Sequence, residues 1–138
     1  MTPDLEALAR RAVACPRWRW MPGVLRLRDA PGKADHGQRE GRVEARDGWP
    51  YAEWPCLPDL TDPATLGCLL ALVREVYGSP ALYCRLSSTT RASDGIRAWE
   101  VIGWLDASRS PNGRGGSFLG WGYASEAEAL VATLEAAP

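Results

Sequence analysis

The segment from Leu57 to Pro80, LPDLTDPATLGCLLALVREVYGSP, constrains the fold more than any other part of the chain. Asp62 is an expected N-cap and Pro63 an expected first helical residue, while Gly78 marks the end of the helix. Apolar residues repeat at helical spacing, and further small or apolar residues widen their face: Leu66, Leu69, Leu70, Val73, Val76 and Tyr77, then Cys68, Ala71 and Leu72. Because this face is so broad, the pattern predicts a core helix that is nearly enclosed.

The length and composition of the chain bound its class. A chain of 138 residues with 46% hydrophobic content fits one globular domain spanning residues 1–138. The net charge of −1 gives no basic excess for coating nucleic acid, so nucleic acid is not an expected partner. No apolar run approaches the roughly 20 residues that span a bilayer, and the N-terminus lacks the features of a signal peptide. The sequence therefore predicts a cytoplasmic protein without membrane contact.

Two further helices are predicted at the ends of the chain. Thr2 and Pro3 are a typical N-cap and first helical residue, and Pro16 is expected to stop this first helix. Ser125 and Glu128 have the spacing of a capping box at the start of the last helix. The apolar residues of that last helix are expected in the core: Leu130, Val131 and Leu134.

Alternating patterns predict strands in two regions. In RWRWMPGVLRLRD, residues 17–29, Trp and Leu alternate with Arg, and the pattern resumes over 42–46. We interpret 17–54 as an antiparallel meander in which the polar, Gly-rich stretch 29–41 is a flexible loop. A second meander is predicted from the strands 81–88, 96–107 and 117–124. Runs of strands separated by helices indicate an α+β fold, with antiparallel sheet packed against the central apolar helix and the two terminal helices.

The middle strand of the second meander is apolar on both faces. Alternation places two sets of residues on opposite faces: Trp99, Val101, Gly103 and Leu105 against Glu100, Ile102 and Trp104. We therefore expect another element or a partner to cover part of the outward face, and a homo-oligomer is one such arrangement.

The stretch SRSPNGRGG, residues 108–116, is the best candidate ligand loop. Its glycines allow backbone N–H groups to turn toward an anion, and two arginines can clamp a phosphate while a flanking Trp stacks a base. The predicted ligand residues are Trp104, Arg109, Ser110, Asn112, Gly113, Arg114 and Trp121. The spacing matches neither a P-loop nor a dinucleotide fingerprint. The same composition is typical of a solvated hairpin tip, and this alternative stays open.

A second candidate lies in CPRWRWMPG, residues 15–23. Arg17 and Arg19 beside Trp18 and Trp20 form a basic, aromatic strand of the kind that stacks and neutralises a nucleotide. In the alternative interpretation, both Trp side chains pack in the core and both Arg side chains face water.

Neither a catalytic residue nor a metal or cofactor site is predicted. The four cysteines contain no C-x-x-C pair, and the single histidine, His36, lies in the predicted loop far from any of them in sequence. Asp59 and Asp62 are better explained as turn and cap residues than as paired catalytic carboxylates. These patterns favour a non-enzymatic protein.

Three blocks of the chain resemble small uncharacterised proteins of tailed bacteriophages and prophages. The blocks are ALARRAVACPRWRWMPG, LPDLTDPATLGCLLALVREVYG and YASEAEALVATLEAAP. The resemblance implies a viral accessory protein, possessing no assigned reaction, that acts in the cytosol of a host bacterium. With the loop at 108–116, it leads us to expect a counter-defence protein that sequesters a nucleotide-like anion. The alternatives are a protein that blocks a host protein through Arg and Trp side chains, and a structural or DNA-associated phage component.

Overall fold

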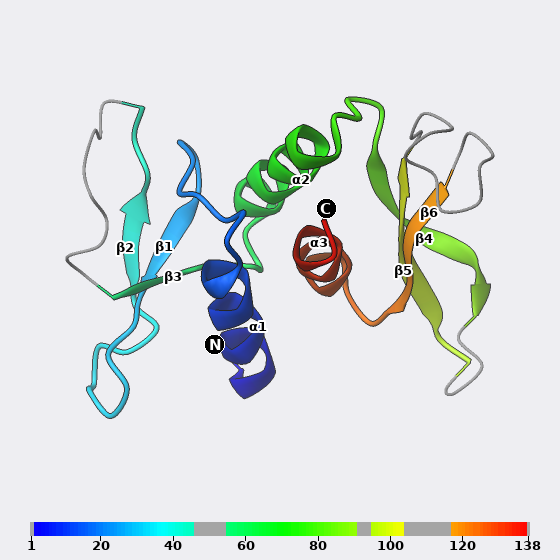
Figure 1. The fold of residues 1–138 in the computed structure, drawn as a ribbon. Helices are drawn as coiled ribbons and strands as arrows, with labels where there is room; N and C mark the ends of the chain where they lie inside the picture. The colour runs from blue at the N-terminus through cyan, green and yellow to red at the C-terminus, as the bar shows by residue number, and fades with distance from the viewer. Residues whose placement is uncertain (1, 46–54, 91–94, 104–116, 138) are drawn as a thin grey trace. The chain divides into compact units, whose positions relative to one another are not determined.

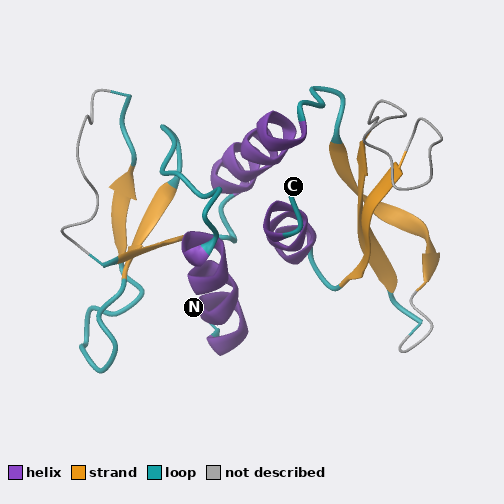
Figure 2. Cartoon of the chain, in the orientation of Figure 1, coloured by secondary structure: helices purple, strands orange, loops and turns teal. Residues whose placement is uncertain are grey.

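The computed structural model describes residues 2–45, 55–90, 95–103 and 117–137. Within these residues the chain forms three helices and six strands, which confirms the predicted α+β class (Figures 1 and 2). In chain order they are α1 (Pro3–Ala14), β1 (Leu25–Arg28), β2 (Arg39–Arg42), β3 (Cys56–Pro58), α2 (Pro63–Tyr77), β4 (Tyr83–Thr90), β5 (Arg97–Gly103), β6 (Ser117–Tyr123) and α3 (Glu126–Glu135). The strands form two antiparallel sheets of order β2-β1-β3 and β4-β5-β6.

The chain divides into two compact units, Met1–Cys68 and Leu69–Pro138. The N-terminal unit contains α1 and the first sheet, and the C-terminal unit contains the second sheet and α3. The division falls inside α2, after its first six residues. None of the described helices is long and apolar enough to cross a membrane.

In the N-terminal unit, α1 and the first sheet bury their apolar sides. The hydroxyl of Thr2 accepts a hydrogen bond from the Leu5 N–H at 3.4 Å, as expected of an N-cap. On β1, buried leucines alternate with half-buried arginines, so the predicted period of two is confirmed for this strand. The buried side chains include Leu8, Ala9, Ala12, Leu25, Leu27 and Leu57.

The strand predicted at the start of the first meander is wrong. Residues 18–21 have no strand structure, and the first backbone bonds to the neighbouring strand segment are those of Gly23 and Val24 with Val43. The chain turns instead, with the Trp18 N–H donating to the Cys15 carbonyl at 2.9 Å. Pro16 and Pro22 flank the segment, and neither has the N–H that a strand ladder needs.

The loop predicted over 29–41 is shorter than expected, because Arg39–Arg42 form β2. The Arg28 N–H donates to the Gln38 carbonyl at 2.9 Å, which starts the pairing of the two strands. Turns shape the chain between them, with N–H groups of Lys33 and His36 donating to the carbonyls three residues earlier.

In the C-terminal unit, α3 packs on one face of the second sheet (Figure 1). The predicted capping box is present, since the Ser125 hydroxyl accepts from the Glu128 N–H at 3.1 Å. The hydroxyl of Tyr77 in α2 donates to the Thr133 carbonyl of α3 at 3.0 Å, so the two helices share a buried polar contact. The core comprises Leu69, Leu72, Val73, Leu82, Val101, Leu130, Val131 and Leu134.

The predicted central helix has the expected start, but it is not enclosed. The Thr65 N–H donates to the Asp62 carboxylate at 2.8 Å, which makes Asp62 the N-cap of α2. Ala71 is exposed, and several apolar side chains are only half-buried: Leu66, Leu70 and Val76. The helix therefore buries one broad side, and the expectation of near-complete enclosure is wrong.

Candidate binding face on the C-terminal sheet

Arg85 of β4 and Glu100 of β5 are direct neighbours across the second sheet. The Nε–H of Arg85 donates to Oε1 of Glu100 at 2.7 Å. The side chain of Glu100 is 3% exposed, whereas that of Arg85 is 51% exposed. The hydrogen bond to Glu100 raises the pKa of the Arg85 guanidinium above its ordinary value. Arg85 is therefore a permanent cation that a buried carboxylate holds in one orientation.

Two exposed aromatic rings lie beside this ion pair. The Cζ atom of Arg85 lies 5.8 Å from the centroid of the Tyr83 ring, which precedes it by two residues on the same side of β4. Trp121 of β6 is opposite Glu100 on its other flank, and 51% of Trp121 is exposed. We call this surface the Arg85 face and define it by Tyr83, Arg85, Glu100, Ile102 and Trp121.

The other face of the same sheet lies against α3. Cys84, Val101 and Gly120 are paired across the three strands, and Val101 is fully buried. Burial, and secondarily the charge of Glu126 in α3, raises the pKa of the Cys84 thiol to about 12. Because side chains alternate along a strand, the Arg85 face is turned away from α3. This confirms the predicted alternation of β5 over its described residues.

A β-bulge at Gly122 determines which residue of β6 faces Glu100. Trp99 pairs with Tyr123, but Glu100 pairs with Trp121, so Gly122 is an extra residue on β6. Gly122 has a φ of +93°, a conformation that side chains rarely adopt. Bulges of this kind redirect side chains at functional edges of sheets. Here the bulge brings the exposed Trp121 ring beside the ion pair.

Most of the predicted ligand residues lie outside the described part of the chain: Trp104, Arg109, Ser110, Asn112, Gly113 and Arg114. Trp121, the remaining residue of that predicted site, is described and exposed. Sequence reasoning missed Tyr83, Arg85 and Glu100. The alternation of YCR in a predicted strand could have indicated that Tyr83 and Arg85 share a face. The sequence alone does not show that Arg85 is opposite Glu100.

The second predicted site has a different arrangement from the one expected. Trp18 and Trp20 contact each other edge to face, with ring centroids 5.5 Å apart and an interplanar angle of 84°. Both rings are half-buried, while Arg17 and Arg19 are exposed. The two Trp rings pack on each other, and ligand binding by this segment stays a prediction.

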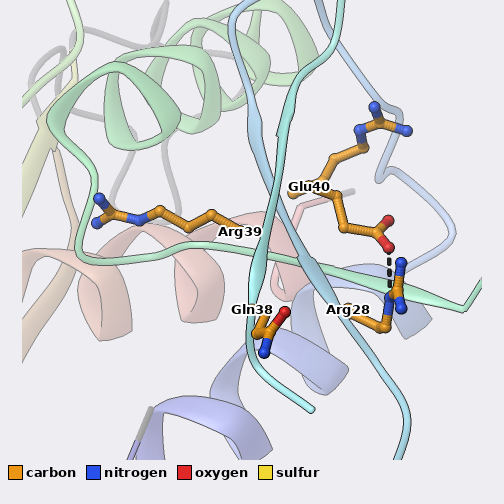
Figure 3. A pocket seen from close by; sticks show the side chains of 5 residues that line it. Arg28, Gln38, Arg39 and Glu40 are labelled. Carbon is orange, nitrogen blue, oxygen red and sulfur yellow. Dashed lines mark hydrogen bonds and ion pairs between the residues drawn. The ribbon is translucent and has the colours of Figure 1, made fainter. Parts of the chain in front are cut away.

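The N-terminal unit has an open polar hollow of about 240 Å³, shown in Figure 3. It is lined by Arg26, Arg28, Gln38, Arg39 and Glu40. Arg28 bonds to Glu40 at 2.6 Å and also to Asp35, while Arg39 points away from this pair and contacts Asp59 at 3.2 Å. Carboxylates therefore already offset the charge of these two arginines, which weakens the hollow as an anion site.

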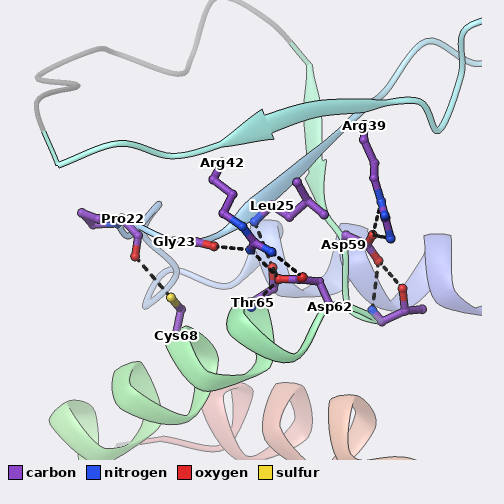
Figure 4. Close-up of polar contacts among 10 residues, drawn as sticks. Pro22, Gly23, Leu25, Arg39, Arg42, Asp59, Asp62, Thr65 and Cys68 are labelled. Carbon is purple, nitrogen blue, oxygen red and sulfur yellow. Dashed lines mark hydrogen bonds and ion pairs between the residues drawn. The ribbon is translucent and has the colours of Figure 1, made fainter.

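A second polar cluster of the N-terminal unit joins its sheet to the start of α2 (Figure 4). Arg42 donates to both carboxylate oxygens of Asp62 at 2.7 Å and to the Gly23 carbonyl at 2.8 Å. Asp62 also accepts from the backbone and hydroxyl of Thr65, and that hydroxyl accepts from the Leu25 N–H at 2.9 Å. These bonds, led by the one to Arg42, hold the pKa of Asp62 well below its usual range. The cluster is explained by its structural role.

Cys56 and His36 are poorly suited to nucleophilic catalysis. Burial, followed by a hydrogen bond to Glu40, raises the pKa of the Cys56 thiol to about 11. His36 accepts the Ala30 N–H at Nδ1, at 3.1 Å, so its neutral form carries the proton on Nε2, which contacts Glu6 at 3.1 Å. Both ring nitrogens are therefore occupied by structural contacts.

Within the described residues, no group of three or more His, Cys, Asp or Glu side chains is arranged to hold a metal ion. No known protein family, curated protein or solved structure matches the chain. The chemistry of the Arg85 face is therefore the main guide to function.

Proposed function

We propose that this protein is a binding module that engages a partner protein through the Arg85 face. The observation that carries the proposal is the placement of the exposed side chains of Tyr83, Arg85 and Trp121 around Glu100, on the sheet face turned away from α3. Tyr, Arg and Trp are the residue types most enriched among the energetically dominant positions of protein interfaces. Their clustering on one sheet face is typical of an interaction surface.

The fixed geometry of Arg85 supports the same function. A guanidinium already held by Glu100 and Tyr83 loses little conformational freedom when a partner binds. The resemblance to phage proteins supplies the biological context of this proposal. In that context the chain is an accessory, counter-defence protein that blocks a protein of the host bacterium in the cytosol.

Affinity purification tests this proposal. The tagged protein, its Trp121→Ala variant and its Arg97→Ala variant are incubated with bacterial lysate, and bound proteins are quantified by mass spectrometry. Arg97 is a matched control because it is an exposed arginine of the same sheet outside the Arg85 face. We expect one host protein whose recovery falls at least tenfold with Trp121→Ala and is unchanged with Arg97→Ala. Equal recovery with both variants would exclude the Arg85 face as the interface.

A nucleotide-like anion is the second candidate ligand, and the presence of Arg85 and Trp121 on the two strands that flank Glu100 favours it. An exposed indole can stack a base while a guanidinium binds phosphate. Thermal unfolding with cyclic and linear nucleotides separates the two candidates. A nucleotide that raises the midpoint in the parent protein, but not in Trp121→Ala, supports the small ligand.

A further inference from the structure

We propose that Arg85 is a receptor for a carboxylate, so that the partner presents an acidic side chain next to an aromatic or aliphatic one. This inference rests on the proposed function and specifies the chemistry of the partner. Its basis is the hydrogen-bonding state of Arg85, the charge beneath it and the rings on either side of it.

The guanidinium of Arg85 has donors to spare. It carries five N–H groups, and the Nε–H donates to Glu100. Among the described residues no other acceptor bonds to Arg85, so both Nη groups are available on a side chain that is 51% exposed. The two neighbouring Nη groups present parallel N–H donors that match the two oxygens of a carboxylate.

Two other arginines of the protein have guanidinium groups whose donors are taken by internal carboxylates. Arg42 binds both oxygens of Asp62 and the Gly23 carbonyl, and Arg10 binds both oxygens of Asp29 in addition to Glu6. In these two cases an internal carboxylate takes the bidentate position. Arg85 donates a hydrogen bond to a carboxylate through its Nε alone, which leaves the bidentate position of its two Nη groups for an external acceptor.

The exposed charge of this pair is positive. Glu100 is buried beside Arg85, so the pair carries no net charge, although its exposed part is the cation. An anion that approaches from solvent therefore meets the Nη groups of Arg85 before the buried carboxylate, and the carboxylate of a partner side chain is such an anion.

The rings define what accompanies the carboxylate. Tyr83 contacts the guanidinium and is 38% exposed, and Trp121, on the strand beyond Glu100, is 51% exposed. Apolar groups of the partner gain by covering these rings, and their burial excludes water from the new ion pair. A carboxylate alone would leave both rings in water.

NMR titration of the isotope-labelled full chain tests the inference with three probes: indole-3-acetate, indole-3-acetamide and acetate. The first carries both a ring and a carboxylate, and the other two carry one each. We expect shift changes at the backbone amides of Tyr83, Arg85 and Trp121, and an affinity about tenfold higher for indole-3-acetate than for the amide, as one additional charge-assisted pair provides. Arg85→Gln should remove this preference because it removes the cation while keeping an N–H donor for Glu100, and Arg97→Ala should keep it.

The outcomes distinguish this inference from the proposed function. If indole-3-acetate and indole-3-acetamide bind equally well, or if Arg85→Gln keeps the preference for indole-3-acetate, the carboxylate assignment is overturned, whereas an aromatic binding face still stands. If no probe shifts the Arg85 face, the assignment is also overturned. Partner capture that is insensitive to Trp121→Ala would instead overturn the proposed function, whatever the probes show.

Discussion

Arg85 Nε lies 2.7 Å from Glu100 Oε1, and of the two side chains only that of Arg85 reaches solvent. A buried carboxylate on the central strand thus orients an exposed cation on the edge strand. This relationship connects the stability of the C-terminal unit to the chemistry of the surface that we propose binds a partner.

The Arg85–Glu100 pair should behave as a coupled unit. Arg85→Ala leaves the buried Glu100 carboxylate without its donor, so we expect a lower thermal midpoint. Adding Glu100→Gln to that variant removes the buried charge and should recover much of the loss. Thermal unfolding of the single and double variants measures the coupling, with Arg97→Ala as the unaffected control. Strictly additive effects would show that the two side chains act independently.

The bulge at Gly122 should be intolerant of a side chain. Gly122→Ala forces alanine into a φ of +93°, and we expect a loss of about 1–2 kcal/mol in the free energy of unfolding. Gly67→Ala is the matched control, because Gly67 lies in α2 with open space around its Cβ position. There we expect a gain of about 0.5–1 kcal/mol. Chemical denaturation measures both, and a neutral Gly122→Ala would contradict the assigned bulge geometry.

The N-terminal unit should lose stability in acid through Asp62. The pKa of Asp62 is lowered in the folded state, first by Arg42 and then by Thr65. The contribution of Asp62 to the free energy of unfolding is therefore complete above the ordinary carboxyl pKa of ~4 and is lost as the pH falls below that value. Asp62→Ala should cost about 1–2 kcal/mol near neutral pH from the lost cap, and less in acid. Unfolding free energies across this pH range test the prediction, and an equal cost at every pH would contradict it.

The thiols of Cys56 and Cys84 should resist alkylation in the folded protein. Their pKa values are raised to about 11 and about 12, so roughly one Cys84 thiol in ten thousand is ionised at pH 8. Because the thiolate is the reacting species, we expect Cys84 to react about a thousandfold more slowly in native than in denatured protein. Mass spectrometry after timed exposure to iodoacetamide measures both rates. Rapid native labelling of Cys84 would contradict the raised pKa of this half-buried thiol.

Local sequence signals predicted a helix or strand well where one segment contains all the residues that determine its structure. α2 begins after Asp62 because the cap, the proline and the apolar repeat are all within one stretch. The register of β5 likewise separates Glu100 from Val101 between the two faces, as its alternation predicted. The strand predicted at 17–20 failed because its alternation had no pairing partner, and pairing is not a local property.

The candidate site was only partly predictable for the same reason. Trp121 was chosen for its position beside the loop at 108–116, but its relation to Glu100 depends on a bulge in β6. Arg85 was not distinguished from the other fourteen arginines, because only the register of β4 on β5 places it against Glu100. Residues from three strands form this surface, and no single stretch of sequence contains it.

Site-specific photo-crosslinking in bacterial cells is the most direct test of the central claim. A photoreactive phenylalanine analogue is placed at position 83 in the Arg85 face, or at position 136, an exposed residue after α3. We predict that position 83 gives a discrete crosslinked species with one partner protein, that Arg85→Ala or Trp121→Ala abolishes it, and that position 136 gives none. The same species from both positions, or one that persists in both variants, would contradict binding through this face.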